Sequence, residues 1–269
     1  MISPKAIKPF IKWAGGKRWL VDNTQFKMPD FDGRYIEPFL GGGAVFFHLS
    51  PARAILSDVN SRLIDTYQAI RSDWKSVEDE LKRMHALHTK EFYYAERDRV
   101  RKALHTQAAQ FLYLNRTCWN GLYRENLAGK FNVPIGTKTQ VILPDDDFPA
   151  VSALLKNADL RCCDFEETLQ DAKAGDLVFL DPPYTTAHNM NGFVKYNQKI
   201  FSWDDQVRLR RCAEAAAMRG ARVVLTNADH ESIRTLYSSM GDPEIVSRAS
   251  VISGRSAARG QTTEALYIF

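Results

Sequence analysis

Short apolar runs alternate with amphipathic stretches toward both ends of the chain. Near the N-terminus, the strand pattern RYIEPF at 34–39 is followed by glycines, by AVFFHL at 44–49 and by AILSD at 54–58. This is the β-α-β cadence of an open parallel sheet. The cadence returns after residue 146, with strand patterns LRCCDF, LVFL, ARVVLTNA and EALYIF at 160–165, 177–180, 221–228 and 264–269. An amphipathic helix is predicted at 203–220, capped by Ser202 and closed by Gly220. The predicted fold class is α/β.

A different pattern occupies the middle of the chain. From Arg62 onward, apolar side chains recur at steps of three and four, at Leu63, Ile64, Tyr67 and Ile70, which predicts a helix. Few strand signals follow before a loop rich in asparagine, glycine and aromatic residues, where 122–134 (LYRENLAGKFNVP) is typical of a β-hairpin. We therefore predict one domain built from residues 1–62 and 146–269, interrupted by a mostly helical domain with a β-hairpin at 63–145.

Composition narrows the class of protein. The chain has 269 residues, of which 45% are hydrophobic and 25% charged, which are ordinary globular values. We expect a cytoplasmic protein without a membrane partner, because no apolar run approaches the roughly 18 residues that a membrane span needs. Cys118, Cys162, Cys163 and Cys212 show no metal-ligand spacing, so neither a zinc site nor a disulfide framework is indicated.

Charge is distributed unevenly along the chain. Residues 99–130 hold six basic residues against Glu125 alone, a local net charge of +5, whereas residues 143–182 hold ten acidic and three basic residues, a net of −7. Such a split suggests one face that meets a polyanion, although a solvated helical face explains the charge counts equally well.

The tetrapeptide Asp181-Pro182-Pro183-Tyr184 directly follows the strand pattern at 177–180. The amine of a heteroaromatic ring is a poor nucleophile until acceptors draw its hydrogens out of plane. The Asp181 carboxylate and the Pro182 carbonyl can accept those hydrogens, with bonds that strengthen as positive charge develops on nitrogen, and Tyr184 can stack on the ring. The ordinary alternative is an Asp-Pro turn that closes a strand.

A second turn suggests a cofactor. The segment 37–43 (EPFLGGG) lies between a strand and a helix, where glycines let a ligand approach the backbone, and the next strand ends in Asp58, which is placed to accept ribose hydroxyls. No GxGxxG pattern accompanies it, and the acidic residue before the glycines disfavours a pyrophosphate. A nucleoside with a positively charged tail, such as S-adenosylmethionine, fits better. Lys17 could meet its carboxylate and Trp13 could line the pocket; alternatively, Trp13 packs into a core.

These segments together resemble a known family. FIKWAGGK, YIEPFLGGGAVFFHL, ILSDVNSRLI, FLYLNRTCWNGLYRENLAGKFNVPIG and VFLDPPY stand in the order and rough spacing of the Dam-like, D12-family (alpha-class) N6-adenine DNA methyltransferases. The resemblance runs from about Lys8 to Phe269. It implies a Rossmann-like, S-adenosylmethionine-dependent methyltransferase sheet with an inserted target-recognition domain.

Family roles carry over by position. The resemblance implies cofactor contacts at Trp13, Lys17, Phe39, Gly41, Asp58, Asp164, Phe165 and Asp181, and a catalytic motif of Asp181, Pro182 and Tyr184. Positions that read or position the duplex in relatives that methylate GATC are matched by Lys12, Asn120, Leu122, Arg124 and Pro134, and an intercalating aromatic position by Trp119. The segment IGTKTQ departs from the Gly-Arg-Tyr that often follows FNVP in GATC methylases.

The DNA side also has a physical rationale. An adenine amine cannot be reached inside the base stack, so the base must flip out, and Trp119 could fill the vacated space. Arg124 could contact guanine bidentately, while Leu122 and Pro134 suit a thymine methyl group. In the ordinary alternative, Leu122 is a core residue and Arg124 pairs with Glu125. Near the C-terminus, Arg255 and Arg259 are expected to contact phosphates.

The expected function is site-specific transfer of a methyl group from S-adenosylmethionine to adenine N6 in double-stranded DNA, within GATC. We expect a monomer on DNA that works either alone or beside a cognate restriction endonuclease. Two alternatives remain open at this stage. One is a methyltransferase that acts on RNA or on a protein glutamine, and the other is a catalytically silent DNA-binding relative.

Overall fold

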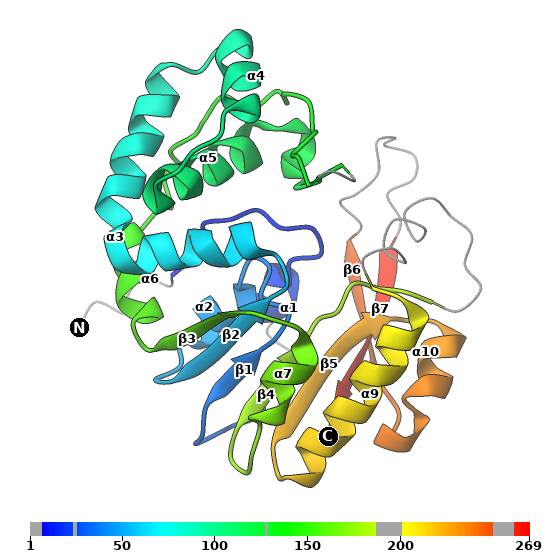
Figure 1. Cartoon of the computed structure of the whole chain (residues 1–269). Coiled ribbons are helices and arrows are strands. Elements are labelled where there is room, and N and C mark those ends of the chain that lie inside the picture. Colours follow the sequence, from blue (N-terminus) through cyan, green and yellow to red (C-terminus); the bar gives the residue numbers. More distant parts are fainter. Residues whose placement is uncertain (1–6, 24–25, 127–128, 187–200, 250–260) are drawn as a thin grey trace. The chain divides into compact units, whose positions relative to one another are not determined.

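One mixed sheet organises the fold. The computed structural model describes residues 7–23, 26–126, 129–186, 201–249 and 261–269 (Figure 1). Its seven strands have the order β3-β2-β1-β4-β5-β7-β6. Their bounds are β1 Tyr35–Glu37, β2 Ala54–Asp58, β3 Ala158–Cys162, β4 Leu177–Leu180, β5 Arg222–Ala228, β6 Glu244–Ala249 and β7 Gln261–Ile268. The sheet is mostly parallel, and the predicted α/β, Rossmann-like class is confirmed.

The chain divides into two compact units. The first consists of Met1–Thr24 and Leu40–Cys162, and the second of Gln25–Phe39 and Cys163–Phe269. The predicted inserted domain at 63–145 falls entirely within the first unit, and its boundaries stay a prediction. Among the helices of the described segments, none is long and apolar enough to cross a membrane.

Helices dominate the first unit. They are α1 Arg18–Val21, α2 Ala44–Leu49, α3 Ser61–Ala86, α4 Lys90–Asp98, α5 Leu104–Thr117, the 3-10 helix η1 Trp119–Gly121, and α6 Phe148–Leu155. The Asn60 side chain caps α3 by accepting a hydrogen bond from the Leu63 N–H at 3.0 Å. The apolar positions read from the sequence, Leu63, Ile64, Tyr67 and Ile70, are fully buried, as expected of the core face of a helix. α3 packs against α5, α6, β2 and β3, and β2 pairs in parallel with β3 (Figure 1).

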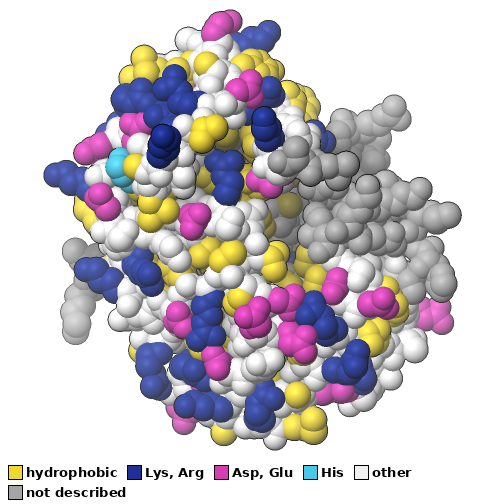
Figure 2. All heavy atoms as spheres, viewed as in Figure 1, with side chains coloured by type: hydrophobic (Ala, Val, Ile, Leu, Met, Phe, Trp, Pro, Cys, Tyr) yellow, Lys and Arg dark blue, Asp and Glu magenta, His cyan; other side chains and the backbone are white. Residues whose placement is uncertain are grey.

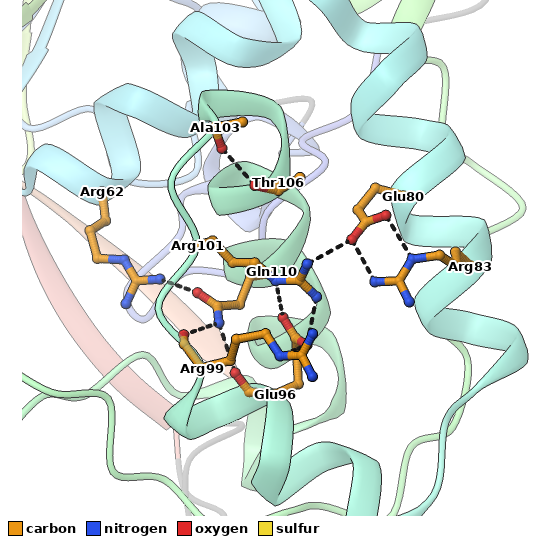
Figure 3. Close-up of polar contacts among 9 residues, drawn as sticks. All are labelled: Arg62, Glu80, Arg83, Glu96, Arg99, Arg101, Ala103, Thr106 and Gln110. Carbon is orange, nitrogen blue, oxygen red and sulfur yellow. Dashed lines mark hydrogen bonds and ion pairs between the residues drawn. The ribbon is translucent and has the colours of Figure 1, made fainter.

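A buried polar network fixes the link between α4 and α5 (Figure 3). The Glu96 carboxylate, which is fully buried, accepts two hydrogen bonds from the Arg101 guanidinium, each 2.7 Å long. The Gln110 amide on α5 donates to the backbone carbonyls of Glu96 and Arg99 and accepts from Arg62. The five-residue link 99–103 is therefore anchored through the Arg101 side chain and the Arg99 carbonyl.

The second unit carries the central strands. β1, β4 and β5 pair in parallel, and β7 and β6 extend the sheet antiparallel. Its helices are α7 Phe165–Gln170, α9 Trp203–Met218, α10 Glu231–Leu236 and the 3-10 helix η2 Ser238–Met240. Ser202 and Asp205 form a capping box at the start of α9, and Gly220 follows its end with φ +87°, so the predicted boundaries of this helix are confirmed. All four residues of β4 are buried, which suits a strand covered on both faces.

Candidate functional site

The Asp181 carboxylate is held from a neighbouring strand. Asp181 comes directly after the buried strand β4, which pairs with β5 through Leu180 and Leu225. The next residue of β5, Thr226, is buried, and its hydroxyl donates a hydrogen bond of 2.8 Å to Asp181 Oδ1. Thr226 Oγ1 also lies 3.4 Å from the Leu180 carbonyl oxygen. The fold thus fixes the orientation of the carboxylate that the sequence predicts to be catalytic.

The Tyr184 hydroxyl donates to Glu264 on β7 at 2.5 Å. Glu264 is only 2% exposed. Burial first, and then the negative charges of Asp181 and Glu264, raise the pKa of Tyr184 well above its usual range. The phenol therefore stays protonated at neutral pH and keeps its hydrogen for the carboxylate.

A second phenol and carboxylate lie in the same unit. The buried Tyr35 hydroxyl on β1 donates to Glu37 Oε2 at 2.9 Å. Burial, followed by Glu37 and then Asp181, raises the pKa of Tyr35. The Asp181 charge therefore acts on both tyrosines.

The turn after Asp181 is supported by α9. The buried Gln206 side chain lies 3.5 Å from the Pro183 carbonyl and accepts a hydrogen bond from Asn227 at 3.1 Å. The Thr185 hydroxyl donates to the Phe201 carbonyl at 2.6 Å. Within the described residues, no hydrogen-bond donor reaches the Pro182 carbonyl. Its predicted role as the second acceptor for an amine stays a prediction.

Three aromatic rings of the second unit pack together. Phe39, after β1, stacks on Phe165 with ring centroids 5.4 Å apart, and Phe201 contacts both rings at 5.7 Å. Arg208 lies over the Phe165 ring at 4.2 Å. The structure thus brings Phe39 and Phe165 into contact, and their predicted cofactor contacts stay a prediction.

Asp164 has a structural task that the sequence analysis missed. It caps α7 by accepting from the Glu166 N–H at 2.9 Å, and both its oxygens accept from Arg208, at 2.6 and 2.9 Å. Asp164 Oδ1 takes part in both the cap and the ion pair. Its predicted cofactor contact stays a prediction.

In the first unit, Gly41 and Asp58 form one backbone cradle. Asp58, at the end of β2, accepts the Gly41 N–H at 3.1 Å and the Asn60 N–H at 3.0 Å. Burial raises the pKa of the Asp58 carboxyl, although these backbone N–H groups act in the opposite direction. Gly41 has φ +46°, and a Cβ atom there would lie 2.6 Å from Trp13 Cδ1. Only a glycine leaves room for the Trp13 ring.

Trp13 joins this cradle to an aromatic stack. Its ring stacks on Tyr123 at 5.6 Å and on Phe111 at 6.3 Å. Lys17 is only 4% exposed, and its ammonium group donates to the Gly15 carbonyl at 2.9 Å. The ring therefore packs into an aromatic cluster and also borders Gly41, and its predicted contact with a cofactor stays a prediction.

The predicted DNA-reading residues Lys12 and those within 119–134 lie together in the first unit. We call this group the tip. Trp119 is 53% exposed, and its N–H donates to the Pro134 carbonyl at 2.9 Å. Asn120 has φ +56°, a left-handed conformation that asparagine tolerates better than most residues. Its carbonyl accepts from the Lys12 ammonium group at 2.6 Å. Four of the predicted residues, Lys12, Trp119, Asn120 and Pro134, are thus joined by hydrogen bonds.

Leu122 and Arg124 lie at the same tip. Leu122 is 37% exposed, which argues against the core interpretation. Arg124 Nε donates to the Asn132 side chain at 2.9 Å, whereas Glu125 accepts from the Tyr123 hydroxyl. Each residue of the alternative Arg124–Glu125 pair thus has a different partner. The segment turns back on itself at an antiparallel bridge between Glu125 and Phe131. The predicted hairpin is present there as an isolated bridge instead of two named strands.

Two lysines, Lys12 and Lys138, lie close enough at this tip to influence each other. Partial burial, and then the nearby charge of Lys138, lower the pKa of Lys12. Lys138 belongs to the IGTKTQ segment, where the sequence departs from GATC methylases. On the face drawn in Figure 2, lysine and arginine side chains gather over the α3–α5 part of the first unit. Arg255 and Arg259, which the sequence assigns to phosphate contacts, lie outside the described residues.

Several supporting residues escaped sequence reasoning. Thr226, Glu264, Gln206, Arg208 and Tyr123 hold predicted site residues in place. All of them are distant in sequence from the residue that they contact. For Tyr123, its position between Leu122 and Arg124 in an aromatic segment was an available signal.

Comparison with known proteins gives one family. Residues 13–252 match the family described as D12 class N6 adenine-specific DNA methyltransferase. The chain is 35% identical over 268 residues to Type II methyltransferase M1.LlaDCHI of Lactococcus lactis subsp. cremoris, covering 96% of this chain and 94% of that protein. Identity is 37% over 244 residues with Type II methyltransferase M.MjaIII of Methanocaldococcus jannaschii, covering 82% and 84%. It is 32% over 270 residues with the DNA adenine methylase of Vibrio cholerae serotype O1, covering 98% and 97%. The family match and these identities over nearly the whole chain confirm the resemblance: the chain belongs to the D12 class of N6 adenine-specific DNA methyltransferases.

Proposed function

We propose that this enzyme transfers a methyl group from S-adenosylmethionine to N6 of an adenine flipped out of duplex DNA, within the sequence GATC. The observation that carries the proposal is the Asp181 carboxylate, fixed by Thr226 at 2.8 Å at the end of β4. It precedes a Pro182 carbonyl with no donor among the described residues. A carboxylate and a carbonyl in one rigid turn supply the two acceptors that an amine needs.

The residues that we assign to the cofactor have chemistry that suits it. Asp58 is a carboxylate suited to ribose hydroxyls, and the glycine at position 41 leaves the backbone open to close approach. Lys17 would meet the carboxylate of the cofactor, and Trp13, Phe39 and Phe165 would supply apolar walls, with Asp164 and Asp181 as further contacts. When bound, S-adenosylmethionine supplies an electrophilic methyl group.

Residues of the protein then bind and orient the N6 amine of the adenine. Asp181 and the Pro182 carbonyl accept its two hydrogens, which draws the nitrogen lone pair out of conjugation with the ring. Both hydrogen bonds strengthen as positive charge develops on nitrogen, so they stabilise the transition state more than the bound base. Tyr184 stacks on the adenine.

The tip of the first unit delivers the base. Flipping a base costs a few kcal/mol, and the exposed ring of Trp119 would offset part of this by filling the vacated space. Lys12, Asn120, Leu122, Arg124 and Pro134 would read or position the duplex. Arg124, oriented by Asn132, would contact guanine, a pairing worth roughly 1–3 kcal/mol of discrimination. Arg255 and Arg259 would add phosphate contacts.

Transfer of a labelled methyl group tests the proposal. The protein is incubated with labelled S-adenosylmethionine and one of three substrates: a duplex containing GATC, a duplex of equal composition containing GTAC instead, or a structured RNA. We expect label in the first duplex only, with N6-methyladenine recovered after digestion. The variant Asp181→Ala is the matched control, and it should bind the duplex while transferring nothing. Label in RNA or in protein, or wild-type activity in the variant, would contradict the proposal.

The biological role follows from the same substrate. We propose a cytoplasmic enzyme that binds DNA as a monomer and works either alone or beside a cognate restriction endonuclease. The names of its relatives support both roles, since they include Type II methyltransferases and DNA adenine methylases. Mass photometry of the protein with a GATC duplex should detect a one-to-one complex.

A further inference from the structure

Glu264 is a buried carboxylate that accepts from Tyr184. It lies on β7, is 2% exposed, and receives the Tyr184 hydroxyl at 2.5 Å across a separation of 80 residues. In the strand register, Glu264 stands opposite Ala228, two residues after Thr226 on β5. Two adjacent strands therefore each direct one polar side chain at the Asp181–Tyr184 turn, Thr226 to its first residue and Glu264 to its last.

We propose that Glu264 is a positioning residue for methyl transfer, which fixes the Tyr184 ring in the orientation that stacks on the target adenine. This inference rests on the proposed function, because it concerns the same site. Glu264 touches neither the base nor the methyl donor in this account. It acts on the reaction through the hydrogen bond from the Tyr184 hydroxyl.

Because Glu264 is buried, a role in packing alone does not explain why a carboxylate stands at this position. A carboxylate is far more costly to bury than an apolar side chain of similar volume, and β7 otherwise places Ala265, Leu266 and Tyr267 in the core. A leucine at position 264 would fill the same strand position without that cost. What a leucine cannot provide is an acceptor for the phenol.

The hydrogen bond also has a definite direction. A phenol has one hydrogen to donate, and a short contact to an ionised oxygen is a strong, charge-assisted bond. Because the pKa of Tyr184 is raised, the phenol keeps this hydrogen over the whole range in which the enzyme would work. With its hydroxyl anchored, the ring loses the freedom to swing about its side-chain torsions, and the stacking surface is preorganised.

Variants that remove either the acceptor, Glu264, or the donor, Tyr184, distinguish a positioning role from a packing role. In Glu264→Leu the acceptor is lost, and we expect kcat to fall about tenfold while KM for DNA changes less than about threefold. In Glu264→Gln the amide oxygen still accepts from the phenol, so kcat should stay within about threefold of the wild type. Tyr184→Phe removes the donor and leaves Glu264 in place, and its kcat should fall about as far as in Glu264→Leu.

The double variant Tyr184→Phe with Glu264→Leu gives the sharpest test. If Glu264 acts through Tyr184, the second substitution adds no further loss of kcat. Fluorescence of 2-aminopurine at the target position should report normal base flipping but weaker stacking in both single variants. Glu244→Leu, an exposed glutamate replaced on neighbouring β6, is the matched control and should retain wild-type kcat.

Three results would overturn the proposal. They are an additive loss in the double variant, a loss in Glu264→Gln as large as in Glu264→Leu, and wild-type kcat in Tyr184→Phe. Wild-type kcat in Tyr184→Phe remains measurable if Glu264→Leu does not fold, and so does a loss in Glu264→Gln of about tenfold relative to the wild type. Failure of the proposed function would look different, because the wild type itself would then transfer no methyl group to duplex DNA. The contact would still be tested by alkaline titration, since removing the carboxylate charge in Glu264→Gln should lower the pKa of Tyr184, and an unchanged pKa would refute the contact.

Discussion

At the scale of single residues, the reactivity assigned to Asp181 depends on Thr226. We expect Thr226→Val to lower kcat about tenfold, because a hydrogen bond to a charged group contributes roughly 1.5–3 kcal/mol and fixes the carboxylate geometry. Thr226→Ser keeps the hydroxyl and should retain most of the activity. Steady-state kinetics with a GATC duplex measure both variants. Equal activity in Thr226→Val and the wild type would show that Asp181 needs no support from β5.

If Asp58 binds the cofactor as proposed, cofactor affinity should depend on pH. Its pKa is raised by burial, and the ionised form is the one that accepts ribose hydroxyls, so affinity should fall as pH decreases toward the raised value, above the ordinary aspartate value of about 4. Calorimetric titration with S-adenosylmethionine between about pH 7.5 and 5 measures this, and Asp58→Asn should flatten the profile. A wild-type affinity constant over this range would contradict the account.

The same residue affects stability with the opposite sign. A folded-state pKa above the unfolded value means that the folded protein holds the proton more tightly. The contribution of Asp58 to the free energy of unfolding is therefore fully present below the unfolded pKa and is lost as pH rises through the folded one. Through Asp58, a lower pH should therefore raise the free energy of unfolding of the protein without cofactor, whereas a higher pH should favour cofactor binding.

At the scale of elements, the turn between β1 and α2 is set by contact with Trp13. In Gly41→Ala the new Cβ atom would meet Trp13 Cδ1 at 2.6 Å in a left-handed backbone, so the ring must move. We expect a loss of about 1–3 kcal/mol in the free energy of unfolding and a weaker affinity for S-adenosylmethionine. Gly241→Ala is the matched control, because its φ is +93° and nothing lies within 4 Å. If both variants bind the cofactor as the wild type does, the Trp13 contact has no part in the pocket.

The link between α4 and α5 depends on Glu96. Removing this buried partner of Arg101 in Glu96→Ala should cost roughly 3–5 kcal/mol in the free energy of unfolding, because the guanidinium loses two hydrogen bonds in a partly buried position. The exposed Glu91 on the same helix is the control, and Glu91→Ala should change it by less than about 1 kcal/mol. Denaturant unfolding measures both. Equal stabilities would mean that solvent or another side chain replaces the ion pair.

The sequence predicts the elements better than it predicts their connections. The strands at 54–58 and 177–180 and the helix after Ser202 have strong periodicity or explicit caps, and they are found where expected. β6 at Glu244–Ala249 was missed, because a half-exposed strand that pairs only with β7 has no continuous apolar run. The predicted hairpin at 122–134 has turn residues, and its described residues form one antiparallel bridge, between Glu125 and Phe131.

Some residues of the candidate site could likewise be predicted from local sequence signals, and others could not. Asp181, Asp58 and Gly41 carry local signals, since each ends a strand or occupies a glycine turn. Thr226 and Glu264 carry none, because their tasks arise only when β5 and β7 are brought next to the Asp181–Tyr184 turn. Which strand neighbours which depends on sheet order, and local pattern does not encode that order.

At the scale of the whole molecule, the two units hold different parts of the predicted machinery. The first contains the Asp58 cradle and the basic tip around Trp119, and the second contains the Asp181–Tyr184 turn. The second unit also holds the predicted cofactor contacts Phe39, Asp164 and Phe165. A variant at the Trp119 tip should therefore affect sequence recognition, and a variant at the Asp181–Tyr184 turn should affect the chemical step.

Sequencing DNA from a methylation-free host that expresses the enzyme, with a readout sensitive to N6-methyladenine, tests the central claim most directly. Wild-type protein should place N6-methyladenine at GATC on both strands, and Asp181→Ala, expressed at the same level, should place none. Unmodified DNA from cells containing folded wild-type protein, or modified adenines in cells expressing Asp181→Ala, would contradict the account.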